Sequence, residues 1–467
     1  MKIYSTPLFT LLLIALLSCK HQEKTDHMAA SERTGELRWP QWVTQGNIYE
    51  VNIRQYTPEG TFAAMQQHLP RLQQMGVKIL WLMPIFPISS TKRKGGLGSY
   101  YAVSDYRNTN PEFGSIKDFD SLVTKAHTLG MKVILDWVPN HTGWDHKWIS
   151  EHPDYYTKGT DGNITDPLNP DTGESWGWSD VADLNYDNTD MREQMTSDLL
   201  YWVQEHGIDG YRFDISHGVP IDFWRTANPT LLRANPDLFL LSESELQQHV
   251  SEGLFHAIYG WPAHHMMNDI AKGNTATIDK LHKWIVDNEL KAGVHMHFTS
   301  NHDENSWAGT TAERLGDGAD AFAVLAATMP GIPLIYGGQE EPLDKRLQFF
   351  EKDNIGFHNY KKQKLYTRLL QLKSNEPALA AKTGVGSNLV RLDASDGVYA
   401  YIRGTGSDAV LVILNLSNKL GKVTIPHVMP DMKNMMTGTT ASYSQGQELV
   451  LNRWAYIVAT ATEKNTK

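Results

Sequence analysis

The amino-acid sequence predicts an α/β fold, in which a (β/α)8 barrel carries an insert after its third strand and precedes a separate antiparallel β module. Three observations predict it. Short apolar runs alternate with amphipathic helices eight times over about 300 residues. A segment at about 142–190 is rich in Gly, Asp, Asn, Trp and Pro and lacks helical periodicity. The last 80 or so residues contain short β-type runs separated by turn residues.

The eight predicted strands are mostly apolar, which is typical of strands that are buried on both faces of a parallel sheet. A doubly wound parallel sheet would have the same local pattern, so the sequence pattern alone leaves this alternative open. In order, the predicted strands cover residues 47–57, 77–84, 131–138, 208–214, 238–243, 255–261, 294–300 and 332–336.

Helices are predicted between these strands. Over 62–75, apolar residues recur at the spacing that places them on one face of a helix. Further helices are predicted over 119–129 and 191–206. In the C-terminal module, the β-type runs are 389–392, 398–402, 410–416, 422–425 and 454–459.

Composition and charge exclude several classes of protein. The chain has 467 residues, of which 41% are hydrophobic and 21% charged, which is ordinary for a globular protein and excludes a wholly disordered chain or a simple coiled coil. The net charge of −10 gives no general attraction to phosphate backbones, so we expect no nucleic-acid partner. The 14 Trp, 19 Tyr and 14 Phe can fill cores, but aromatic rings also stack on the apolar faces of sugars.

The N-terminus resembles that of a bacterial lipoprotein. The apolar run 8–17 is too short to span a membrane but has the length of a signal-peptide core. The single cysteine, Cys19, excludes an internal disulfide and follows Leu16, Leu17 and Ser18, an ending that resembles a lipobox. The resemblance implies a signal peptide over 1–18, a lipid on Cys19 and a tether over 19–36. The protein is then exported and anchored to a membrane on the periplasmic side or outer surface of a bacterial envelope. The alternative is an ordinary signal peptide with an incidental cysteine.

Four carboxylates stand at the ends of predicted strands: Asp136, Asp214, Glu243 and Asp303. Catalytic residues of (β/α)8 barrels lie at these C-terminal ends, and charges placed there are costly to desolvate. Any single one could belong to a structural ion pair, but four on one rim favour a site. Such a set suits glycoside hydrolysis, which needs one ionised and one protonated carboxyl group. Arg212 lies two residues before Asp214 on the same side of a strand, so it can keep Asp214 anionic.

The motifs around these residues resemble the ordered signature regions of the α-amylase family, glycoside hydrolase family 13. The similarity spans about residues 45–350. It implies a catalytic barrel over 37–385, which includes an insert subdomain at about 142–190, and a C-terminal antiparallel β-sandwich over 386–467. The motifs are DWVPNH (136–141), GYRFD (210–214), Glu243 and SNHD (300–303), with GSYYAVSDY (98–106), ADLN (182–185) and PGIPLIYGGQE (330–340) beside them.

The resemblance assigns roles to individual residues. It implies that Asp214 is the nucleophile, that Glu243 is the general acid/base, and that Asp303 is a third carboxylate that binds sugar hydroxyls. The reaction would then retain anomeric configuration through a covalent glycosyl intermediate on Asp214. Asp136 is expected to order Arg212 and its neighbours. The residues implied to bind the sugar are Tyr101, His141, Arg212 and His302, although either histidine could instead be a satisfied core residue.

The same resemblance implies a structural calcium ion. The residues that match its ligand positions are Asn140, Asp183 and, through its backbone carbonyl, Gly218; hard oxygen ligands of this kind suit calcium and would pin the insert over the cleft. Many members of the family have Lys-His after the nucleophile where this chain has His217-Gly218. The lysine contact on the leaving-group side is therefore absent from this sequence.

Two aromatic or histidine pairs carry alternatives of their own. Trp176 and Trp178 could line sugar subsites or fill a small core in the insert. His264 and His265 could suggest a metal pair, but adjacent side chains diverge on regular structure, so packing and hydrogen bonding are favoured.

The sequence therefore predicts an enzyme that hydrolyses α-1,4-glucosidic bonds of starch, glycogen or maltooligosaccharides. Two alternatives remain. The same site could serve a cyclomaltodextrinase or transglycosylase acting on small maltodextrins. A non-catalytic glycan-binding protein could use the same fold, although binding alone does not require all three of Asp214, Glu243 and Asp303.

Overall fold

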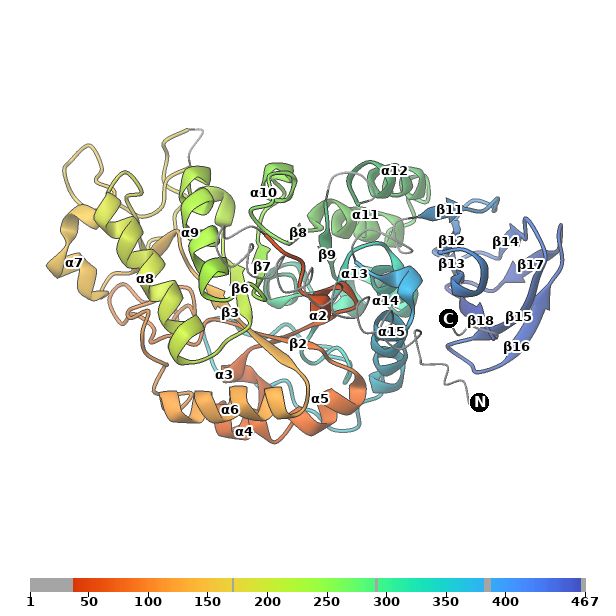
Figure 1. The fold of residues 1–467 in the computed structure, drawn as a ribbon, viewed down its shortest axis with the longest axis horizontal. Helices are drawn as coiled ribbons and strands as arrows, with labels where there is room; N and C mark the ends of the chain where they lie inside the picture. Colours follow the sequence, from red (N-terminus) through yellow and green to blue (C-terminus); the bar gives the residue numbers. More distant parts are fainter. Residues whose placement is uncertain (1–36, 170–171, 290–292, 382–387, 463–467) are drawn as a thin grey trace, which may run out of the picture.

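A closed barrel of eight parallel strands forms the centre of the molecule (Figure 1). The computed structural model describes residues 37–169, 172–289, 293–381 and 388–462. Around the barrel, the strands follow the order β1-β10-β9-β8-β7-β6-β3-β2, which closes the sheet and excludes the doubly wound alternative. The barrel strands are β1 (Ile48–Val51), β2 (Ile79–Leu82), β3 (Lys132–Trp137), β6 (Gly210–Phe213), β7 (Phe239–Ser242), β8 (Ala257–Tyr259), β9 (His295–His297) and β10 (Ile332–Tyr336).

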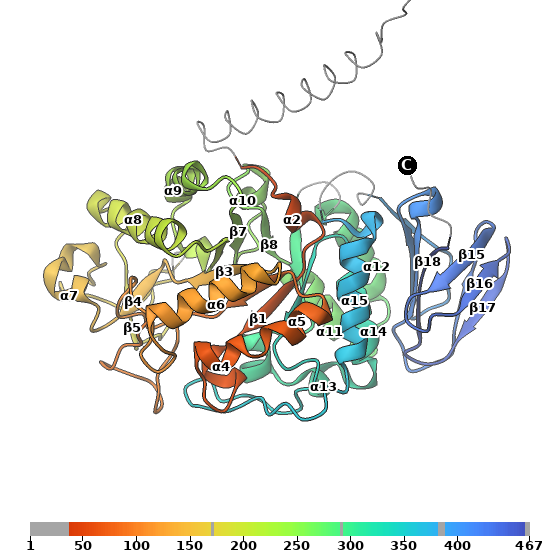
Figure 2. The same ribbon diagram turned by 60° about the horizontal axis from the view of Figure 1, so that its bottom comes forward.

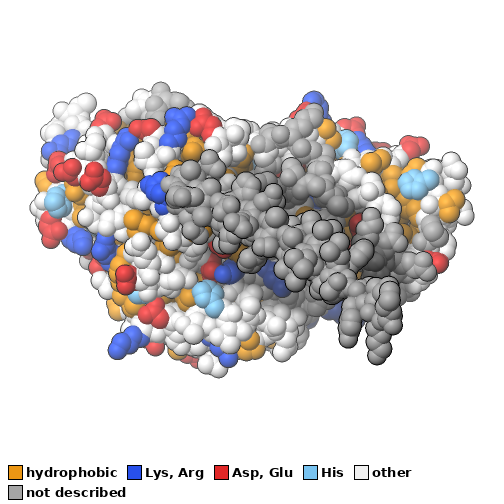
Figure 3. Space-filling view, in the orientation of Figure 1, with side chains coloured by type: hydrophobic (Ala, Val, Ile, Leu, Met, Phe, Trp, Pro, Cys, Tyr) orange, Lys and Arg blue, Asp and Glu red, His pale blue; other side chains and the backbone are white. Residues whose placement is uncertain are grey.

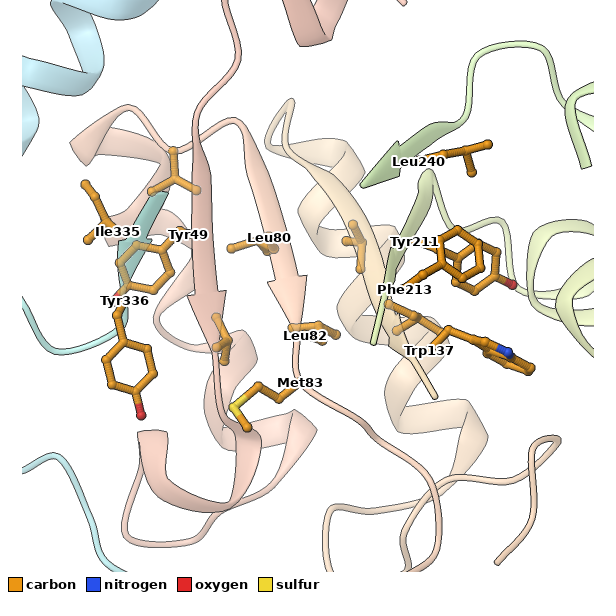
Figure 4. Close-up of a cluster of buried hydrophobic side chains, with 14 of the residues drawn as sticks. Tyr49, Leu80, Leu82, Met83, Trp137, Tyr211, Phe213, Leu240, Ile335 and Tyr336 are labelled. Atoms are coloured by element: carbon orange, nitrogen blue, oxygen red, sulfur yellow. The ribbon is translucent and has the colours of Figure 1, made fainter. Parts of the chain in front are cut away.

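Alternate side chains of each strand pack into two different cores. On β2, Ile79 and Trp81 join the cluster inside the barrel, whereas Leu80 and Leu82 join the larger cluster between the sheet and the helices. Figure 4 shows part of this outer cluster, with Leu80 and Leu82 beside Tyr49 of the neighbouring strand. Both faces of the strands are therefore buried, which explains why their sequences are apolar without alternation.

Helices surround the barrel on its outer side (Figures 1 and 2). The longest are α8 (Thr189–Glu205), α9 (Ile221–Ala234), α6 (Ile116–Thr128) and α15 (Gln363–Asn375). A capping box at Ser115 and Asp118 begins α6. The others are α2 (Gln41–Thr44), α3 (Ile53–Tyr56), α7 (Lys147–Glu151), α10 (Gln247–Ser251), α11 (Trp261–Ala271), α12 (Thr277–Trp284), α13 (Thr311–Leu315) and α14 (Ala319–Thr328).

One predicted helix is divided in the structure. The segment 62–75 forms α4 (Phe62–Gln66) and α5 (Leu69–Met75) with a turn between them. Pro70 lies in the first turn of α5 and cannot donate a backbone hydrogen bond to Gln66. The apolar spacing was therefore read correctly, but the break that the proline introduces was not.

The insert after β3 is attached to the barrel through a small antiparallel sheet. Its strands are β4 (His141–Gly143) and β5 (Val181–Asp183), and the pairing sets His141 directly opposite Asp183. The backbone N–H of Leu184 also donates to the carbonyl of Asn140, at 3.2 Å. The end of β3 and the end of the insert are thus joined at the edge of the barrel.

The C-terminal module consists of two antiparallel sheets, at one end of the molecule in Figure 1. Side chains on one face of the larger sheet, such as Tyr401, join the outer core of the barrel, whereas those on the other face, such as Ile402, form a separate core. The larger sheet contains β11 (Leu389–Arg391), β12 (Val398–Arg403), β13 (Val410–Asn415), β18 (Tyr456–Ala461), β15 (Met429–Asn434) and β16 (Thr440–Tyr443), and the smaller contains β14 (Gly421–Thr424) and β17 (Glu448–Leu451).

Three of these strands, β15, β16 and β17, were not predicted. The sequences of β15 and β16 contain many polar residues, and β15 has an irregular register between Met429 and Met432. Asp431 in this bulge has a φ of 47°, a left-handed conformation that interrupts the alternation on which a sequence pattern depends.

The predicted signal peptide, the tether and Cys19 all lie outside the described residues. In the part of the chain that the structure does describe, no helix is both long enough and apolar enough to cross a membrane. Where side chains are visible on the face in Figure 3, acidic and basic groups are intermixed rather than gathered into one basic area.

Candidate active site

Three carboxylates at the ends of barrel strands border one cleft. Asp214 directly follows β6, Glu243 directly follows β7, and Asp303 lies beyond β9 at the start of a π-helical turn, Glu304–Ala308. All three line a cleft of about 1290 Å³. The structure therefore brings together the residues of three predicted motifs that are far apart in the sequence.

Arg212 connects the carboxylates beneath the cleft. Its Nη1 donates to Asp136 Oδ1 and to Asp214 Oδ1, each at 2.8 Å, and its Nε donates to the hydroxyl of Tyr259 at 3.0 Å. Its Nη2 forms an ion pair with Glu243 Oε1 at 2.7 Å. Arg212 is fully buried and does not line the cleft, so in this structure it holds the carboxylates rather than meeting a ligand.

Asp136 lies on the same floor. Its Oδ2 accepts hydrogen bonds from the hydroxyl of Tyr101 at 3.0 Å and from the indole N–H of Trp81 at 3.2 Å. Burial raises the pKa of Asp136 to about 6, even though the Arg212 guanidinium acts in the other direction. Like Arg212, Asp136 is covered and does not border the cleft.

The pKa values of Asp214 and Glu243 are shifted in opposite directions. Burial and the neighbouring Glu243 raise the pKa of Asp214 well above its usual value. Burial also acts to raise the pKa of Glu243, but the charge of Arg212 and a hydrogen bond from the Ile215 backbone N–H, at 2.9 Å, leave that pKa below its usual value. Of the two carboxyl groups, Asp214 therefore has the stronger tendency to bind a proton in the free site.

The turn after Asp214 is conformationally unusual. Ile215 has a φ of 41° and a ψ of 44°, in the left-handed region that β-branched residues rarely adopt. This conformation directs the Ile215 N–H to Oε2 of Glu243. The backbone next to one carboxylate thus supports the other.

His302 is held by a residue that the sequence patterns did not reveal. Its Nδ1 lies 2.5 Å from Oε1 of Glu50, which is fully buried on β1, and its Nε2 lies 2.7 Å from the hydroxyl of Tyr101 and 3.3 Å from Asp303 Oδ2. Burial acts to lower the pKa of His302, but Asp303 and Glu50 together raise it to about 9. His302 is therefore protonated at neutral pH. The one signal for Glu50 was a charged residue inside an otherwise apolar strand.

Tyr101 and His141 line the cleft as predicted, with different electrostatic properties. The Tyr101 ring lies against His302, with ring centroids 5.5 Å apart and planes inclined by 24°. Burial lowers the pKa of His141 to about 4, so this imidazole is neutral at pH 7. The two predicted histidines thus differ, since His302 offers a cation and His141 offers a neutral ring.

The predicted calcium ligands gather where the insert meets the barrel. A Cβ on Gly218 would lie only 2.6 Å from Asn140 Oδ1, so only glycine leaves room for that oxygen. Burial raises the pKa of Asp183 to about 7, and the groups that act on it are the Thr157 hydroxyl and the like charge of Asp166. A partly buried carboxylate and an amide oxygen, on segments whose backbones are paired, suit a hard divalent cation, so these residues fit calcium.

The two pairs left open by the sequence are now placed. Trp176 and Trp178 stack on each other, with planes inclined by 14°, and both line the cleft. His264 is buried against Phe298 and its Nε2 lies 2.9 Å from Oε2 of Glu304. Across the described residues, no group of three or more His, Cys, Asp or Glu side chains is arranged to hold a metal ion.

Comparisons with known proteins agree with this geometry. The family model described as the α-amylase catalytic domain matches residues 25–377. The chain is 25% identical over 412 residues to an α-amylase named MalA from Haloarcula japonica, covering 83% of this chain and 58% of that protein. It is also 25% identical over 463 residues to an α-1,4-glucan:maltose-1-phosphate maltosyltransferase from Salinibacter ruber, covering 88% of this chain and 66% of that protein. The chain thus spans about three fifths to two thirds of these relatives' length.

Solved structures give longer coverage. An α-amylase from Lactobacillus plantarum superimposes with a TM-score of 0.78 at 28% identity, covering 90% of this chain and 99% of the other. A maltogenic α-amylase, AmyB, from Thermotoga neapolitana superimposes with a TM-score of 0.77 at 26% identity, covering 91% of this chain and 100% of the other. Together with the family model, these likenesses establish that the chain belongs to the α-amylase family of glycoside hydrolases and transglycosylases.

Proposed function

We propose that this protein is a retaining hydrolase of α-1,4-glucosidic bonds in starch, glycogen or maltooligosaccharides. One observation carries the proposal: Asp214 and Glu243 both bind the guanidinium of Arg212 at the floor of a cleft that Asp303 also borders. A guanidinium shared by two carboxyl groups keeps them close together. A short separation suits a retaining enzyme, because an inverting one needs room for a water molecule between carboxylate and sugar.

In the first step, Oδ2 of Asp214 attacks the anomeric carbon while Glu243 transfers its proton to the glycosidic oxygen. The C–O bond to the leaving sugar breaks, and Asp214 becomes covalently linked to the retained sugar. In the second step, Glu243 takes a proton from water, and the resulting hydroxide displaces Asp214 from the anomeric carbon. Atoms and charges then return to the starting state.

This sequence requires a proton on Glu243, whereas in the free site the pKa of Asp214 is raised and that of Glu243 is lowered. Substrate binding must therefore favour protonation of Glu243 over that of Asp214. A glycosidic oxygen beside Glu243 offers an acceptor, and positive charge developing at the anomeric carbon favours the anionic form of Asp214.

The other residues would position the reacting sugar. Tyr101 presents a flat face for its apolar side, and neutral His141 and protonated His302 can donate hydrogen bonds to its hydroxyls. Asp303, whose side chain is 38% exposed, can accept hydrogen bonds from the same sugar. Arg212 acts from below as a positioning residue, because its donors are already engaged.

Calcium is proposed as a structural ion held by Asn140, Asp183 and the carbonyl of Gly218. Its chemistry would be to neutralise the partly buried Asp183 and to bind the insert to the barrel. No catalytic step depends on it.

The decisive test of the function is Asp214→Asn. The variant keeps the shape of the side chain but removes the nucleophile, so turnover of amylose oligosaccharides should fall at least 1,000-fold or so with folding intact by circular dichroism. Unchanged turnover would rule out the assigned mechanism. It would leave a glycan-binding protein as the alternative.

A second candidate activity is a transglycosylase or cyclomaltodextrinase acting on small maltodextrins. The similarity to a maltosyltransferase supports this second candidate. Chromatography of the products from soluble starch, maltotriose and cyclodextrin separates the two. Products longer than the substrate would indicate transfer, and a preference for cyclodextrin would indicate a cyclomaltodextrinase.

We further propose that a lipid on Cys19 anchors the exported protein to the cell envelope, on the strength of the Leu-Leu-Ser-Cys segment. Cys19→Ala should release the protein from the membrane fraction of the producing cell. Retention of that variant in the membrane fraction would contradict the anchor.

A further inference from the structure

A strip of aromatic rings continues outward from the reacting subsite along one wall of the cleft. Phe349 lies nearly parallel to Tyr101, with planes inclined by 14° and ring centroids 6.2 Å apart. Trp307 follows, with its ring centroid 5.3 Å from that of Phe349. All three residues line the cleft. The strip therefore begins at the ring on which the reacting sugar is expected to stack and leads away from it.

Trp307 is unusually exposed for so large an apolar side chain, at 56% of its surface. Exposed apolar surface that adjoins a cleft is typical of a ligand-binding area. An indole ring offers a flat face to stack on the apolar side of a sugar and an N–H to bond a hydroxyl. A tryptophan that served only to pack the protein interior would be buried.

Hydrogen bonds join the two segments that carry the strip. Trp307 lies on the π-helical turn Glu304–Ala308, and the buried side chain of Asn305 in that turn bonds the loop that carries Phe349. Asn305 Nδ2 donates to the carbonyl of Lys345 at 3.1 Å, and the N–H of Leu347 donates to Asn305 Oδ1 at 2.8 Å. Asp303 occupies the N-cap position of the same turn, so the third carboxylate and Trp307 come from one short segment.

The strip and the acid/base occupy different walls. The segment after Glu243 contributes Leu246 to the cleft, and the ring Nδ1 of His217 lies 3.4 Å from the Glu243 carbonyl. Because Glu243 protonates the leaving oxygen, this wall adjoins the leaving sugar. Trp307 lies four residues beyond Asp303 and reaches Tyr101 through Phe349, so it belongs to the wall of the stacking ring rather than to that of the acid/base.

We propose that Phe349 and Trp307 form a binding platform for the glucose unit that precedes the reacting one, on the retained side of the scissile bond. The proposal rests on the proposed function and sharpens its substrate class. The enzyme acts best on chains that place at least two glucose units on the retained side, and poorly on single glucosides.

The test compares 4-nitrophenyl α-glucoside with 4-nitrophenyl α-maltoside, because the leaving group is the same and only the retained side differs. Trp307→Ala should lower kcat/KM for release of nitrophenol from the maltoside about tenfold, the size expected for one lost stacking contact, and change the glucoside less than twofold. Trp307→Phe, which keeps a flat face, should restore most of the loss. Leu420→Ala, at an exposed side chain of the C-terminal module outside the cleft, should leave the ratio between the two substrates unchanged.

Equal values for wild type and Trp307→Ala on the maltoside would overturn the platform. So would an equal loss on both substrates, or an equal change of the ratio in Leu420→Ala. Binding gives a readout that does not depend on turnover: in an Asp214→Asn background, Trp307→Ala should raise the Kd for maltotriose about tenfold in calorimetry. An unchanged Kd would contradict the platform. If Trp307→Ala raises the Kd tenfold but the wild type does not turn over the maltoside, the platform stands and the proposed mechanism fails.

Discussion

The floor of the cleft and its walls are built in contrasting ways. On the floor, Arg212 is fully buried and binds Asp136, Asp214 and Glu243 at distances of 2.7–2.8 Å. On the walls, Trp176 and Trp307 are about half exposed and come from the insert and from a short turn. Strand ends fix the floor, whereas the walls depend on loops. The carboxylates thus lie in the part that a barrel positions best, and the exposed aromatic rings in the part that can vary.

Replacing Arg212, on the floor, should have the largest effect on stability and turnover. Arg212→Leu leaves carboxylates buried without their cation, so the free energy of unfolding should fall by roughly 3–5 kcal/mol, measured by urea denaturation. Turnover should fall at least about a hundredfold because Asp214 and Glu243 lose their shared anchor. Arg212→Lys, which keeps the charge but not the planar fork, should recover part of the stability and little of the turnover. Normal turnover in Arg212→Leu would contradict the positioning role.

Glu50→Gln should have a smaller effect on turnover. Glu50 lies on the floor of the cleft and acts through His302. The pKa of His302 is about 9, above its usual 6.5, so the cation is fully present below about pH 6.5 and is lost as pH rises through about 9. The wild-type kcat/KM should therefore decline near pH 9. Glu50→Gln removes a carboxylate that favours the cation, so this decline should move to lower pH and kcat should fall roughly tenfold.

Exposed Glu59→Gln is the matched control for that experiment and should leave the pH profile unchanged. A Glu50→Gln variant with the wild-type alkaline limb would mean that Glu50 has only a packing role.

The smallest expected effect concerns the wall. If calcium binds at Asn140 and Asp183, a chelator should lower the Tm of the wild type by about 2–4 °C, as expected for losing a saturated site in a protein of this size. Asp183→Asn removes the charged ligand, so the chelator should shift its Tm by less than 1 °C or so. Equal shifts in the two proteins would place the ion elsewhere, and no shift in the wild type would argue against calcium.

Sequence reasoning predicted the floor far better than the walls. Asp214, Glu243 and Asp303 follow apolar strands, and parallel strands of a barrel all end on the same rim, so their meeting could be inferred from order alone. Glu50 could not be assigned, because its contact with His302 joins residues 252 positions apart and its only local signal is a charge within an apolar strand.

The walls depend on features that local patterns do not encode. The platform role of Trp307 requires a π-helical turn and a contact with Phe349 on another loop. Likewise, the sequence left the Trp176 and Trp178 pair undecided between a core and a cleft wall, and only the arrangement of the insert distinguishes them. Loop geometry is set by tertiary contacts, which explains why these residues were the hardest to interpret.

The left-handed backbone at Ile215 has a consequence for how this barrel can change. A branched residue in that conformation costs on the order of 1–3 kcal/mol, which the surrounding strands must supply. This strained conformation directs the Ile215 N–H to Glu243. A substitution that relaxed the backbone would therefore raise stability and lower activity. Variants that gain heat resistance should therefore arise in the outer helices or the C-terminal sheets, and seldom in the turn after the nucleophile.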